Sequence, residues 1–295
     1  MLMVERGCKA LQNGALSWEW RVLALCCLLA LAIALPPRAR TVSQREEGVT
    51  VPIVMYHSLL KDPARHGAYT VSPSVLESDV RYLLAHGYTP VWISDLIAYV
   101  HHGAPLPEKP VVITFDDGHL NNLTYALPIL EKLGAKAVLS AVGAYADEAE
   151  RQADPNPAYA YLTWADLQTL QKSGCFQILS HSYDLHGTGH RNGVSRMAGE
   201  VLAVYQGVVA GDTERMRQAL HDRVGADTPA FTYPFGFVDE DGEQLLRRLG
   251  YLATLSCRET RNRITRNPEC LYALGRFNRP AYMSTAAFMK RLLGK

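Results

Sequence analysis

The sequence predicts an α/β protein with a parallel sheet, folded as a barrel rather than as an open sheet. Seven or eight short apolar strands alternate with helices after residue 50. Two acidic residues directly follow one of these strands, and two histidines follow another. Functional side chains gather in this way at the carboxyl ends of barrel strands, which favours the barrel.

The chain begins with a hydrophobic segment that is typical of exported proteins. Residues 22–35 form an uninterrupted apolar run of 14, whereas a bilayer span needs about 20 and a signal sequence about 7–15. We expect a signal peptide or signal-anchor over residues 1–35, a linker over 36–50 and one domain over 51–295. A buried core helix is the alternative for the apolar run. Both main interpretations predict a protein outside the cytoplasm, secreted or anchored to the membrane by this segment.

Strands are expected in the domain where short apolar runs are bounded by turn residues. They lie at 51–56, 89–93, 111–115, 137–142, 177–180, 231–233, 252–256 and 271–277. Sequences of this length and apolar character are typical of strands that are buried in a parallel sheet.

Helices are expected where apolar residues recur every three or four positions. They lie at 73–86, 94–103, 120–133, 163–174, 240–249 and 284–293, and on either side of Gly211-Asp212 between 195 and 224. Ser72 is the expected N-cap of the first helix and Gly87 its stop, while Ser94 and Thr163 are expected to cap later ones. Pro128 should interrupt the helix at 120–133.

The composition excludes several classes of protein. The formal net charge is +1, and the residues after 50 include 24 basic and 25 acidic ones, so binding of nucleic acid through a basic surface is not expected. Neither of the glycine-rich nucleotide-binding motifs occurs. No C-x-x-C pair occurs either, which argues against a thiolate zinc site. Cys257 and Cys270 could form a disulfide in an oxidising compartment.

Residues 114–118 (TFDDG) bring an apolar strand directly into two adjacent carboxylates. Burying the charge of Asp116 or Asp117 without a partner is costly, so such a pair rarely serves packing. A metal ion can neutralise one carboxylate and leave the other as a base. A surface turn is the alternative interpretation, because D-D-G is also a common turn sequence.

Residues 180–186 (SHSYDLH) place two histidines after another strand. His181 and His186 can reach one ion if the chain turns between them, and two imidazoles with one carboxylate form a common set of three ligands. Isolated histidine pairs at this spacing are usually bystanders. The acid pair at a second strand end therefore favours a metal site.

Together with YPFG at 233–236, these motifs resemble the carbohydrate esterase family 4 (NodB-homology) polysaccharide deacetylases. The resemblance spans about residues 51–280, with support from MYH at 55–57 and LGRF at 274–277. The five-residue spacing of the histidines looks more like the poly-N-acetylglucosamine deacetylase branch.

The resemblance implies a distorted (β/α) barrel of about seven parallel strands and a divalent metal held by Asp117, His181 and His186. It implies that Asp116 is the general base for metal-activated water, which removes N-acetyl groups from an extracytoplasmic amino-sugar polysaccharide. The implied chemistry is sound, because a Lewis-acid metal lowers the pKa of bound water to about 7.

The turn at 233–236 is expected to contact the substrate. Such a turn can aim a backbone N–H at the oxyanion, and Tyr233 and Phe235, which flank Pro234 and precede Gly236, offer aromatic surface to a sugar ring.

The sequence departs from the family pattern at two places. The arginine usual in the third motif is missing, and no histidine follows His221, so the family's late histidine has no counterpart. We expect Arg276 or His57 to compensate.

The substrate, the metal and the activity itself leave alternatives open. The polymer could be peptidoglycan, a chitin-like oligomer or poly-N-acetylglucosamine, and zinc is the first choice of metal, with Co²⁺, Ni²⁺ and Fe²⁺ as alternatives. Because of the two departures, a catalytically silent glycan-binding module is the second hypothesis. A glycoside hydrolase is the third, and it would need two carboxylates about 5–10 Å apart across one bond.

Overall fold

The structure, a computed structural model, describes residues 48–237 and 239–294. The chain divides into two units, residues 1–45 and 46–295, and the described residues belong to the second. The apolar run at 22–35 and most of the expected linker lie outside them. Within the described residues, no helix has the length and apolar character needed to cross a membrane.

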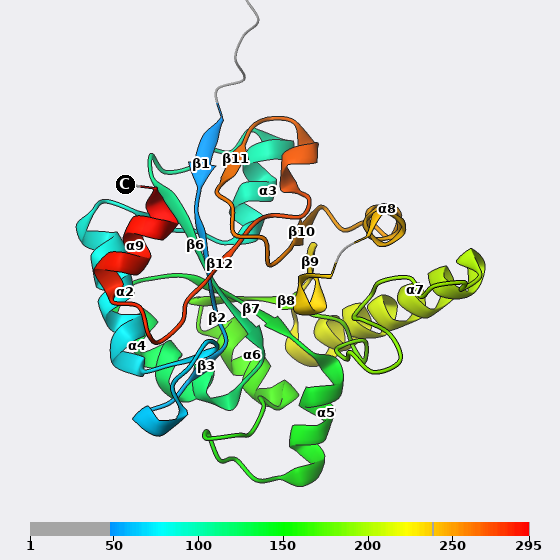
Figure 1. Ribbon diagram of the computed structural model, residues 1–295, viewed down its shortest axis with the longest axis horizontal. Helices are drawn as coiled ribbons and strands as arrows, with labels where there is room; N and C mark the ends of the chain where they lie inside the picture. The colour runs from blue at the N-terminus through cyan, green and yellow to red at the C-terminus, as the bar shows by residue number, and fades with distance from the viewer. Residues whose placement is uncertain (1–47, 238, 295) are drawn as a thin grey trace, which may run out of the picture. The chain divides into compact units, whose positions relative to one another are not determined.

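An eight-stranded parallel sheet forms the centre of this unit (Figure 1), as the alternation of strands and helices predicted. The strands follow one another in the order β10-β9-β8-β7-β6-β2-β12, and β5 pairs with β6 outside this series. Their bounds are β2 Ile53–Tyr56, β5 Thr89–Pro90, β6 Pro110–Asp117, β7 Ala137–Ala141, β8 Phe176–Ser180, β9 Ala230–Thr232, β10 Ala253–Leu255 and β12 Phe277–Asn278.

The sheet curls into a half-barrel whose two edges are bridged by one segment. Leu274 forms a parallel bridge with Leu255 of β10. Three residues later, Phe277 of β12 pairs with Val54 of β2. The segment from Leu274 to Phe277 therefore bonds to the edge strand β10 and, as β12 begins at the other edge, to β2, and it carries Arg276 between these two contacts.

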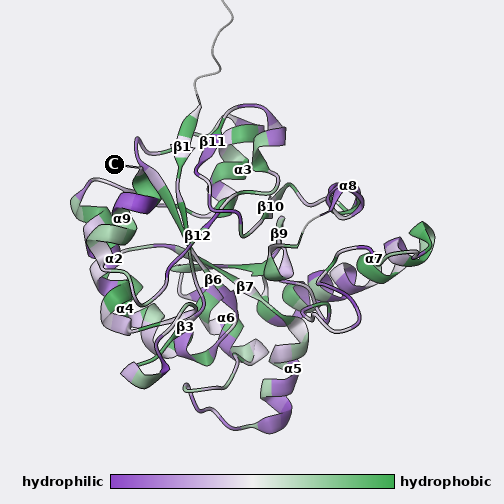
Figure 2. Cartoon of the chain, viewed as in Figure 1, coloured by the Kyte–Doolittle hydropathy of each residue, from purple (hydrophilic) through white to green (hydrophobic). Residues whose placement is uncertain are grey.

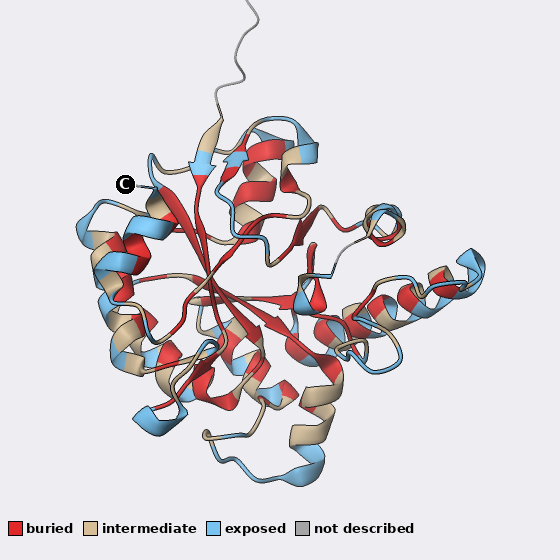
Figure 3. Cartoon of the chain, viewed as in Figure 1, coloured by how far each residue is buried: buried red, intermediate tan, exposed pale blue. Residues whose placement is uncertain are grey.

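Eight helices in the described residues surround the sheet. They are α2 Pro73–Ala85, α3 Ile93–His102, α4 Leu127–Leu133, α5 Gly143–Gln152, α6 Trp164–Lys172, α7 Leu202–Ala219, α8 Glu240–Arg248 and α9 Thr285–Leu293. Two small sheets complete the fold: β1 (Val49–Val51) with β11 (Asn262–Ile264), and β3 (Ser58–Leu59) with β4 (Thr70–Val71). The central strands are apolar and buried, whereas most helices expose a polar face (Figures 2 and 3).

The alternation of side chains along β6 places Asp116, the expected general base, on the inner face of the sheet. Ile113 and Phe115 of β6 pack in the larger core with α2, α4, α6 and α9. Val112 points the other way, into a second core that α3 covers. Because neighbouring side chains of a strand point to opposite faces, Thr114 and Asp116 follow Val112 on that inner face, with Asp116 near its carboxyl end.

Most predicted helices are confirmed, and their ends have local causes. Ser72 caps α2 by accepting the N–H of Val75 at 3.2 Å. Pro128 lies in the first turn of α4, where a preceding π-helical turn ends. The expected cap at Ser94 is wrong: α3 starts at Ile93, because the Asp95 carboxylate accepts the N–H of Trp92 at 2.9 Å.

Other expectations differ from the structure. The strand expected at 51–56 divides at Pro52, which cannot donate to a strand ladder, into β1 and β2; β1 starts inside the expected linker. Helix α7 runs without a break through Gly211-Asp212, and α5 has no counterpart in the predictions. The disulfide is not formed, since Cys257 and Cys270 are both free thiols.

Candidate metal centre and active site

The carboxyl ends of the strands open into a cleft of about 580 Å³. Its walls come from the last residues of β6 and from residues that follow β2, β6, β8, β9 and β10. They include His57, Asp116, Asp117, His119, His181, His186, Phe235 and Cys257, with Arg65, Tyr69 and Tyr159 from the surrounding loops. Side chains that are far apart in the sequence meet here because parallel strands end at the same edge of the sheet.

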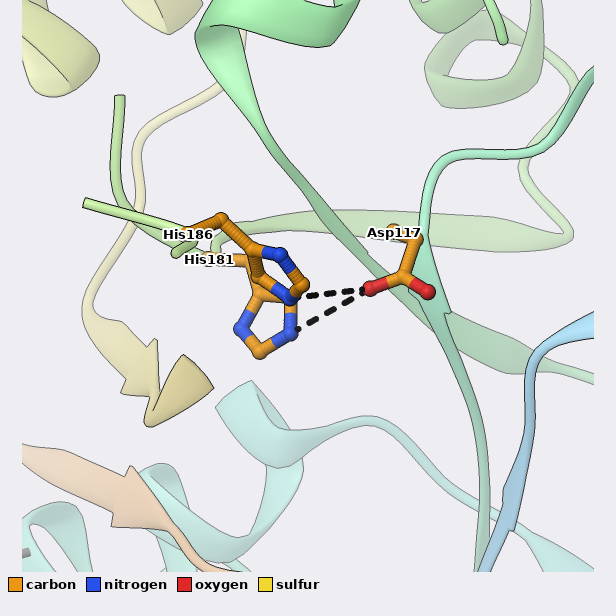
Figure 4. Close-up of side chains that lie close together, drawn as sticks. All are labelled: Asp117, His181 and His186. Atoms are coloured by element: carbon orange, nitrogen blue, oxygen red, sulfur yellow. Dashed lines mark ion pairs between the residues drawn. The ribbon is translucent and has the colours of Figure 1, made fainter. Parts of the chain in front are cut away.

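Asp117, His181 and His186 converge on one point of this cleft. Their three ligand atoms lie within 4.8 Å of one another, and both imidazoles approach the same oxygen of Asp117 (Figure 4). The Asp117 Oδ1 lies 3.6 Å from His181 Nε2 and 3.2 Å from His186 Nε2. Ligand atoms on a tetrahedral zinc are about 3.3 Å apart, because each bond is about 2.0 Å long. The three predicted ligands therefore fit a divalent metal.

His181 is held in the tautomer that a metal requires. Its Nδ1 lies 2.8 Å from the carbonyl oxygen of Thr232 in β9. A carbonyl can only accept, so Nδ1 carries the proton and Nε2 turns its lone pair toward Asp117. Burial lowers the pKa of His181 to about 4, which keeps the ring neutral and able to bind a cation at neutral pH.

His186 and Asp117 also have outer partners. The Tyr145 hydroxyl, from α5, lies 3.0 Å from His186 Nδ1. The other carboxylate oxygen of Asp117 faces His119 Nε2 at 3.6 Å. Burial raises the pKa of Asp117, but the contacts with His119 and His186 outweigh it and hold the pKa well below its usual value. The carboxylate is therefore ionised.

Three residues of the site adopt a left-handed backbone. The φ angles are +69° at Asp117, +73° at Ser182 and +58° at Phe235. Such angles are strained for residues with a Cβ and persist where surrounding contacts enforce them. Asp117 is the last residue of β6, Ser182 follows the end of β8 by two residues, and Phe235 follows the end of β9 by three. The chain turns at each of these positions, next to the cleft.

Asp116 is bound in a buried ion pair with Arg276. The two guanidinium nitrogens donate to the two carboxylate oxygens at 2.7 and 2.8 Å. The Arg276 Nε donates to the carbonyl of Ser256 at 2.9 Å, so the guanidinium is fixed in one plane. Arg276 has no exposed surface and Asp116 is 2% exposed. The arginine absent from the third motif is thus replaced in space by one near the end of the chain.

This pair keeps Asp116 ionised although it is buried. Burial raises the pKa of Asp116, but the charge and hydrogen bonds of Arg276, together with the nearby His181 and His57, outweigh burial, so the pKa stays below its usual value. Burial lowers the pKa of Arg276, but the Asp116 carboxylate and Cys257 together outweigh it, so the pKa of Arg276 is raised. Arg276 does not line the cleft. The expectation that Arg276 contacts the substrate is therefore wrong. Arg276 instead holds the Asp116 carboxylate from the buried side, away from the cleft.

Only one residue of the turn at 233–236 faces the cleft. Phe235 lines it, is 44% exposed and stacks obliquely on His186 with ring centroids 4.5 Å apart. The expected sugar-binding surface of Tyr233 is wrong. Tyr233 is fully buried, its ring packs against Phe231, and its hydroxyl donates to Glu243 at 2.7 Å.

The other residues of this turn, Pro234 and Gly236, lie outside the cleft and fix the backbone on either side of Phe235. Pro234 is buried, and neither it nor Gly236 lines the cleft. A Cβ on Gly236 would lie 2.8 Å from the Cys257 nitrogen, and its φ is +72°. Among the described residues, the backbone N–H of Tyr233 bonds to Leu255, whereas that of Phe235 has no hydrogen-bond acceptor. Phe235 N–H is therefore the free donor of the turn.

His57 lies in the cleft, as its place after the first strand predicted. Its Nδ1 is buried and has no hydrogen-bond partner among the described residues. Burial lowers its pKa, against the opposing effect of the Asp116 and Asp117 charges. Its ring contacts that of Tyr69 edge-on, with centroids 4.8 Å apart.

The sequence did not reveal the outer partners of the site. Tyr145 follows an unpredicted helix start, and its ring stacks on Tyr161 with centroids 4.3 Å apart. Tyr161 in turn stacks on His119 at 5.0 Å. This aromatic series flanks the three converging side chains, and no motif spacing links its members. The sequence offered one indication of such a series, the two tyrosines at 159 and 161.

The comparisons with known proteins agree with this site. Residues 103–254, just over half of the chain, match the family model described as polysaccharide deacetylase. The chain belongs to the polysaccharide deacetylase family. The resemblance drawn from the three motifs is thereby confirmed.

Two relatives illustrate how far the likeness reaches within the deacetylase family. The chain is 26% identical over 217 residues to the poly-beta-1,6-N-acetyl-D-glucosamine N-deacetylase of Escherichia coli (strain K12), covering 67% of this chain and 32% of that protein. It is 22% identical over 183 residues to the protein of the same name from Staphylococcus aureus (strain N315), covering 62% and 59%. This chain therefore spans about a third of the length of the first relative.

Solved structures show the same fold. IcaB from Ammonifex degensii has a TM-score of 0.66 at 22% identity, over 84% of this chain and 97% of that one. A de-N-acetylase from Aggregatibacter actinomycetemcomitans has a TM-score of 0.70 at 21% identity, over 82% and 100%. These two likenesses support the fold of the deacetylase family.

Proposed function

We propose that this protein is a metal-dependent hydrolase that removes N-acetyl groups from an extracytoplasmic amino-sugar polysaccharide. One observation carries the proposal. A set of three metal ligands, Asp117, His181 and His186, lies in the same cleft as a buried, ionised carboxylate, Asp116, that Arg276 holds. This is the pairing of Lewis acid and base that amide hydrolysis by water requires.

Each ligand is ready to bind a cation. Asp117 is ionised, and the Nε2 of both histidines is directed at its Oδ1. A bound divalent cation would lower the pKa of a water molecule and polarise the acetyl carbonyl. Zinc remains our first choice, because the site offers two imidazoles and a carboxylate and leaves a position open.

Asp116 is the proposed general base. Its ionised carboxylate lines the cleft next to the ligand Asp117, and each of its oxygens retains a lone pair beside the hydrogen bond from Arg276. It can therefore accept a proton from the attacking water. The fixed plane of the guanidinium keeps the carboxylate in one orientation while it does so.

The Phe235 N–H is the proposed oxyanion donor. It is the free backbone donor of the turn at the cleft, and negative charge develops on the acetyl oxygen as water adds. A donor already oriented at that position stabilises the transition state without reorganisation.

His57 is the proposed proton donor to the leaving amine. It is a cleft histidine outside the ligand set, and its Nδ1 is free of other bonds. Because burial lowers its pKa, the ring is neutral near pH 7 and must first take up a proton from solvent; once protonated, it is a stronger acid than an exposed imidazolium. This assigns His57, rather than Arg276, to the role that the missing late histidine leaves open.

The substrate we propose is poly-β-1,6-N-acetylglucosamine, ahead of peptidoglycan and chitin-like polymers. The names of the relatives from Escherichia coli and Staphylococcus aureus support this choice, as does the histidine spacing. Exposed aromatic rings at the cleft, Tyr69, Tyr159 and Phe235, offer stacking surfaces for sugar rings. The apolar run at 22–35 supports a location outside the cytoplasm, secreted or at the membrane.

The test is release of acetate from N-acetylglucosamine oligomers by the purified protein. We expect Asp116→Asn to lose at least 100-fold in kcat, the lower range of general acid–base catalysis, while still binding metal. Asp222→Asn, which changes an exposed carboxylate outside the cleft, is the matched control and should keep full activity. Undiminished turnover in Asp116→Asn would remove the proposed base.

The other two functions have less support. The missing arginine and the missing late histidine motivated the silent glycan-binding module. Arg276 now pairs with Asp116 in place of that arginine, and His57 is proposed for the role of that histidine. A glycoside hydrolase needs two free carboxylates across one bond. Within the described residues, Asp116 and Asp117 are the carboxylates that line the cleft, and each is already engaged.

A further inference from the structure

The three metal ligands are supported unequally by the fold. Asp117 is the last residue of β6, and His181 directly follows β8, where its ring is bonded to Thr232 of β9. His186 lies five residues further on, in an irregular segment without a regular helix or strand. Its position therefore depends on contacts from outside the sheet.

Helix α7 supplies the strongest of these contacts through Asp212. One oxygen of the Asp212 carboxylate accepts the backbone N–H of Tyr183 at 2.8 Å, and the other accepts that of Asp184 at 2.7 Å. Both amides lie between the two ligand histidines. Among the described residues, Asp212 forms no salt bridge, so its hydrogen bonds are made to this segment and not to a surface cation.

The opposite edge of the same segment is bonded to α5. The N–H groups of Gly143 and Ala144 donate to the carbonyls of Ser182 and Tyr183 at 3.2 and 2.7 Å. These are the first residues of α5, whose amides have no partner within the helix. Helix α5 also carries Tyr145, which contacts His186. In Figure 1, α5 and α7 lie on the side of the sheet where β7 and β8 end.

The Tyr183 side chain fixes the segment between the two helices. Its ring fills the space above Gly143, where a Cβ would lie 2.5 Å from a ring carbon. Its hydroxyl bonds to Asp147 of α5. The guanidinium of Arg215, three residues after Asp212 on α7, lies 3.7 Å from the ring centroid. Among the residues that the structure describes, however, it is Asp212 that accepts the backbone N–H groups of Tyr183 and Asp184.

We propose that Asp212 is a positioning residue of the metal centre: by holding the amides of Tyr183 and Asp184, it fixes His186 at the distance from Asp117 and His181 that metal binding needs. This inference rests on the proposed metal-dependent function. Asp212 acts through the backbone and touches neither metal nor substrate. Loss of the Asp212 carboxylate should therefore lower the affinity for metal while the protein still folds.

The test is the metal affinity of Asp212→Asn, which keeps the size of the side chain but turns one acceptor into a donor facing an N–H. Zn²⁺ dissociation constants are measured by competition with a chromogenic chelator, without any glycan. We expect a 10- to 100-fold weaker affinity, the range found for outer partners of metal ligands. The Co²⁺-loaded variant should show an altered visible spectrum, and excess Zn²⁺ should restore its acetate release.

Two further variants separate positioning from general stability. Glu214→Gln changes an exposed carboxylate on the same helix that pairs with Arg217, and it should leave the affinity unchanged. Asp212→Glu keeps both acceptor oxygens one methylene further out, and it should fall between wild type and Asp212→Asn; it replaces the latter if that variant does not fold.

The outcomes distinguish the two proposals. Wild-type protein that binds Zn²⁺ tightly and an Asp212→Asn variant that binds it equally well would overturn the positioning role and leave the proposed function standing. Wild-type protein that binds no divalent metal would overturn both. A weaker affinity in the folded variant, with an unchanged affinity in Glu214→Gln, supports the positioning role.

Discussion

Replacing Arg276 by Gln isolates the energy of the buried pair with Asp116. The substitution removes two charge-assisted hydrogen bonds, of 2.7 and 2.8 Å, and leaves a carboxylate that is 2% exposed without its cation. Breaking a buried pair on one side costs about 3–5 kcal/mol. Since domains are stable by only about 5–15 kcal/mol, we expect Arg276→Gln to lose a large fraction of its free energy of unfolding.

The pH dependence of this loss follows from the pKa of Asp116. In the wild type this pKa is lowered, so the carboxylate stabilises the fold above its unfolded pKa of about 3.9 and loses that effect as the pH falls through the folded pKa. Without Arg276, burial is opposed less and the pKa of Asp116 rises. The destabilisation should therefore be largest at pH 7 and shrink toward pH 5, as the carboxyl becomes protonated.

The assay is urea unfolding of metal-stripped protein at pH 7 and pH 5, with the double variant Asp116→Asn/Arg276→Gln as control. The double variant removes both charges of this buried pair and should be more stable at pH 7 than Arg276→Gln alone. A loss below about 1 kcal/mol in the single variant, the range of exposed ion pairs, would refute the reasoning. A double variant no more stable than the single one would also refute it.

Three further predictions concern the turn after β9. Tyr233→Phe should lower the free energy of unfolding by about 1–2 kcal/mol, the value of one hydrogen bond, and leave KM unchanged; a raised KM would return Tyr233 to the substrate site. Phe235→Ala should raise KM about 2- to 10-fold, since aromatic stacking contributes about 0.5–1.5 kcal/mol; an unchanged KM would exclude stacking. Gly236→Ala, strained by its φ of +72° and by Cys257, should destabilise the fold by at least about 1 kcal/mol in urea unfolding; wild-type stability would contradict this.

The sequence predicted the parallel α/β fold and the convergence of the ligands because both depend on local patterns. Apolar runs identified the strands, and polar residues directly after two of them marked a shared edge. Asp117 and His181 are placed by their strands alone. His186 could be associated with them by its spacing, but the contacts that hold it come from α5 and α7, which no pattern connects to it.

The partner of Asp116 could not be assigned from the sequence for a topological reason. Arg276 follows Asp116 by 160 positions, and the two meet because the segment that carries Arg276 bonds to β10 at one edge of the curled sheet and to β2 near the other. The hydrophobic periodicity of the sequence contains no information about this long-range strand pairing. The wrong expectation that Tyr233 contacts the substrate has a simpler cause. Its ring packs against Phe231 and its hydroxyl bonds to Glu243, and the sequence of a turn does not show whether an aromatic residue has such buried partners.

The most direct test of the proposed function is acetate release before and after removal of metal. Purified protein is assayed with N-acetylglucosamine oligomers as isolated, after a chelator has stripped it to undetectable metal content, and after addition of one equivalent of Zn²⁺. We predict that acetate release disappears with the metal and returns with Zn²⁺, and that Asp117→Ala does not recover. Acetate release that persists in the stripped protein would contradict a metal-dependent deacetylase.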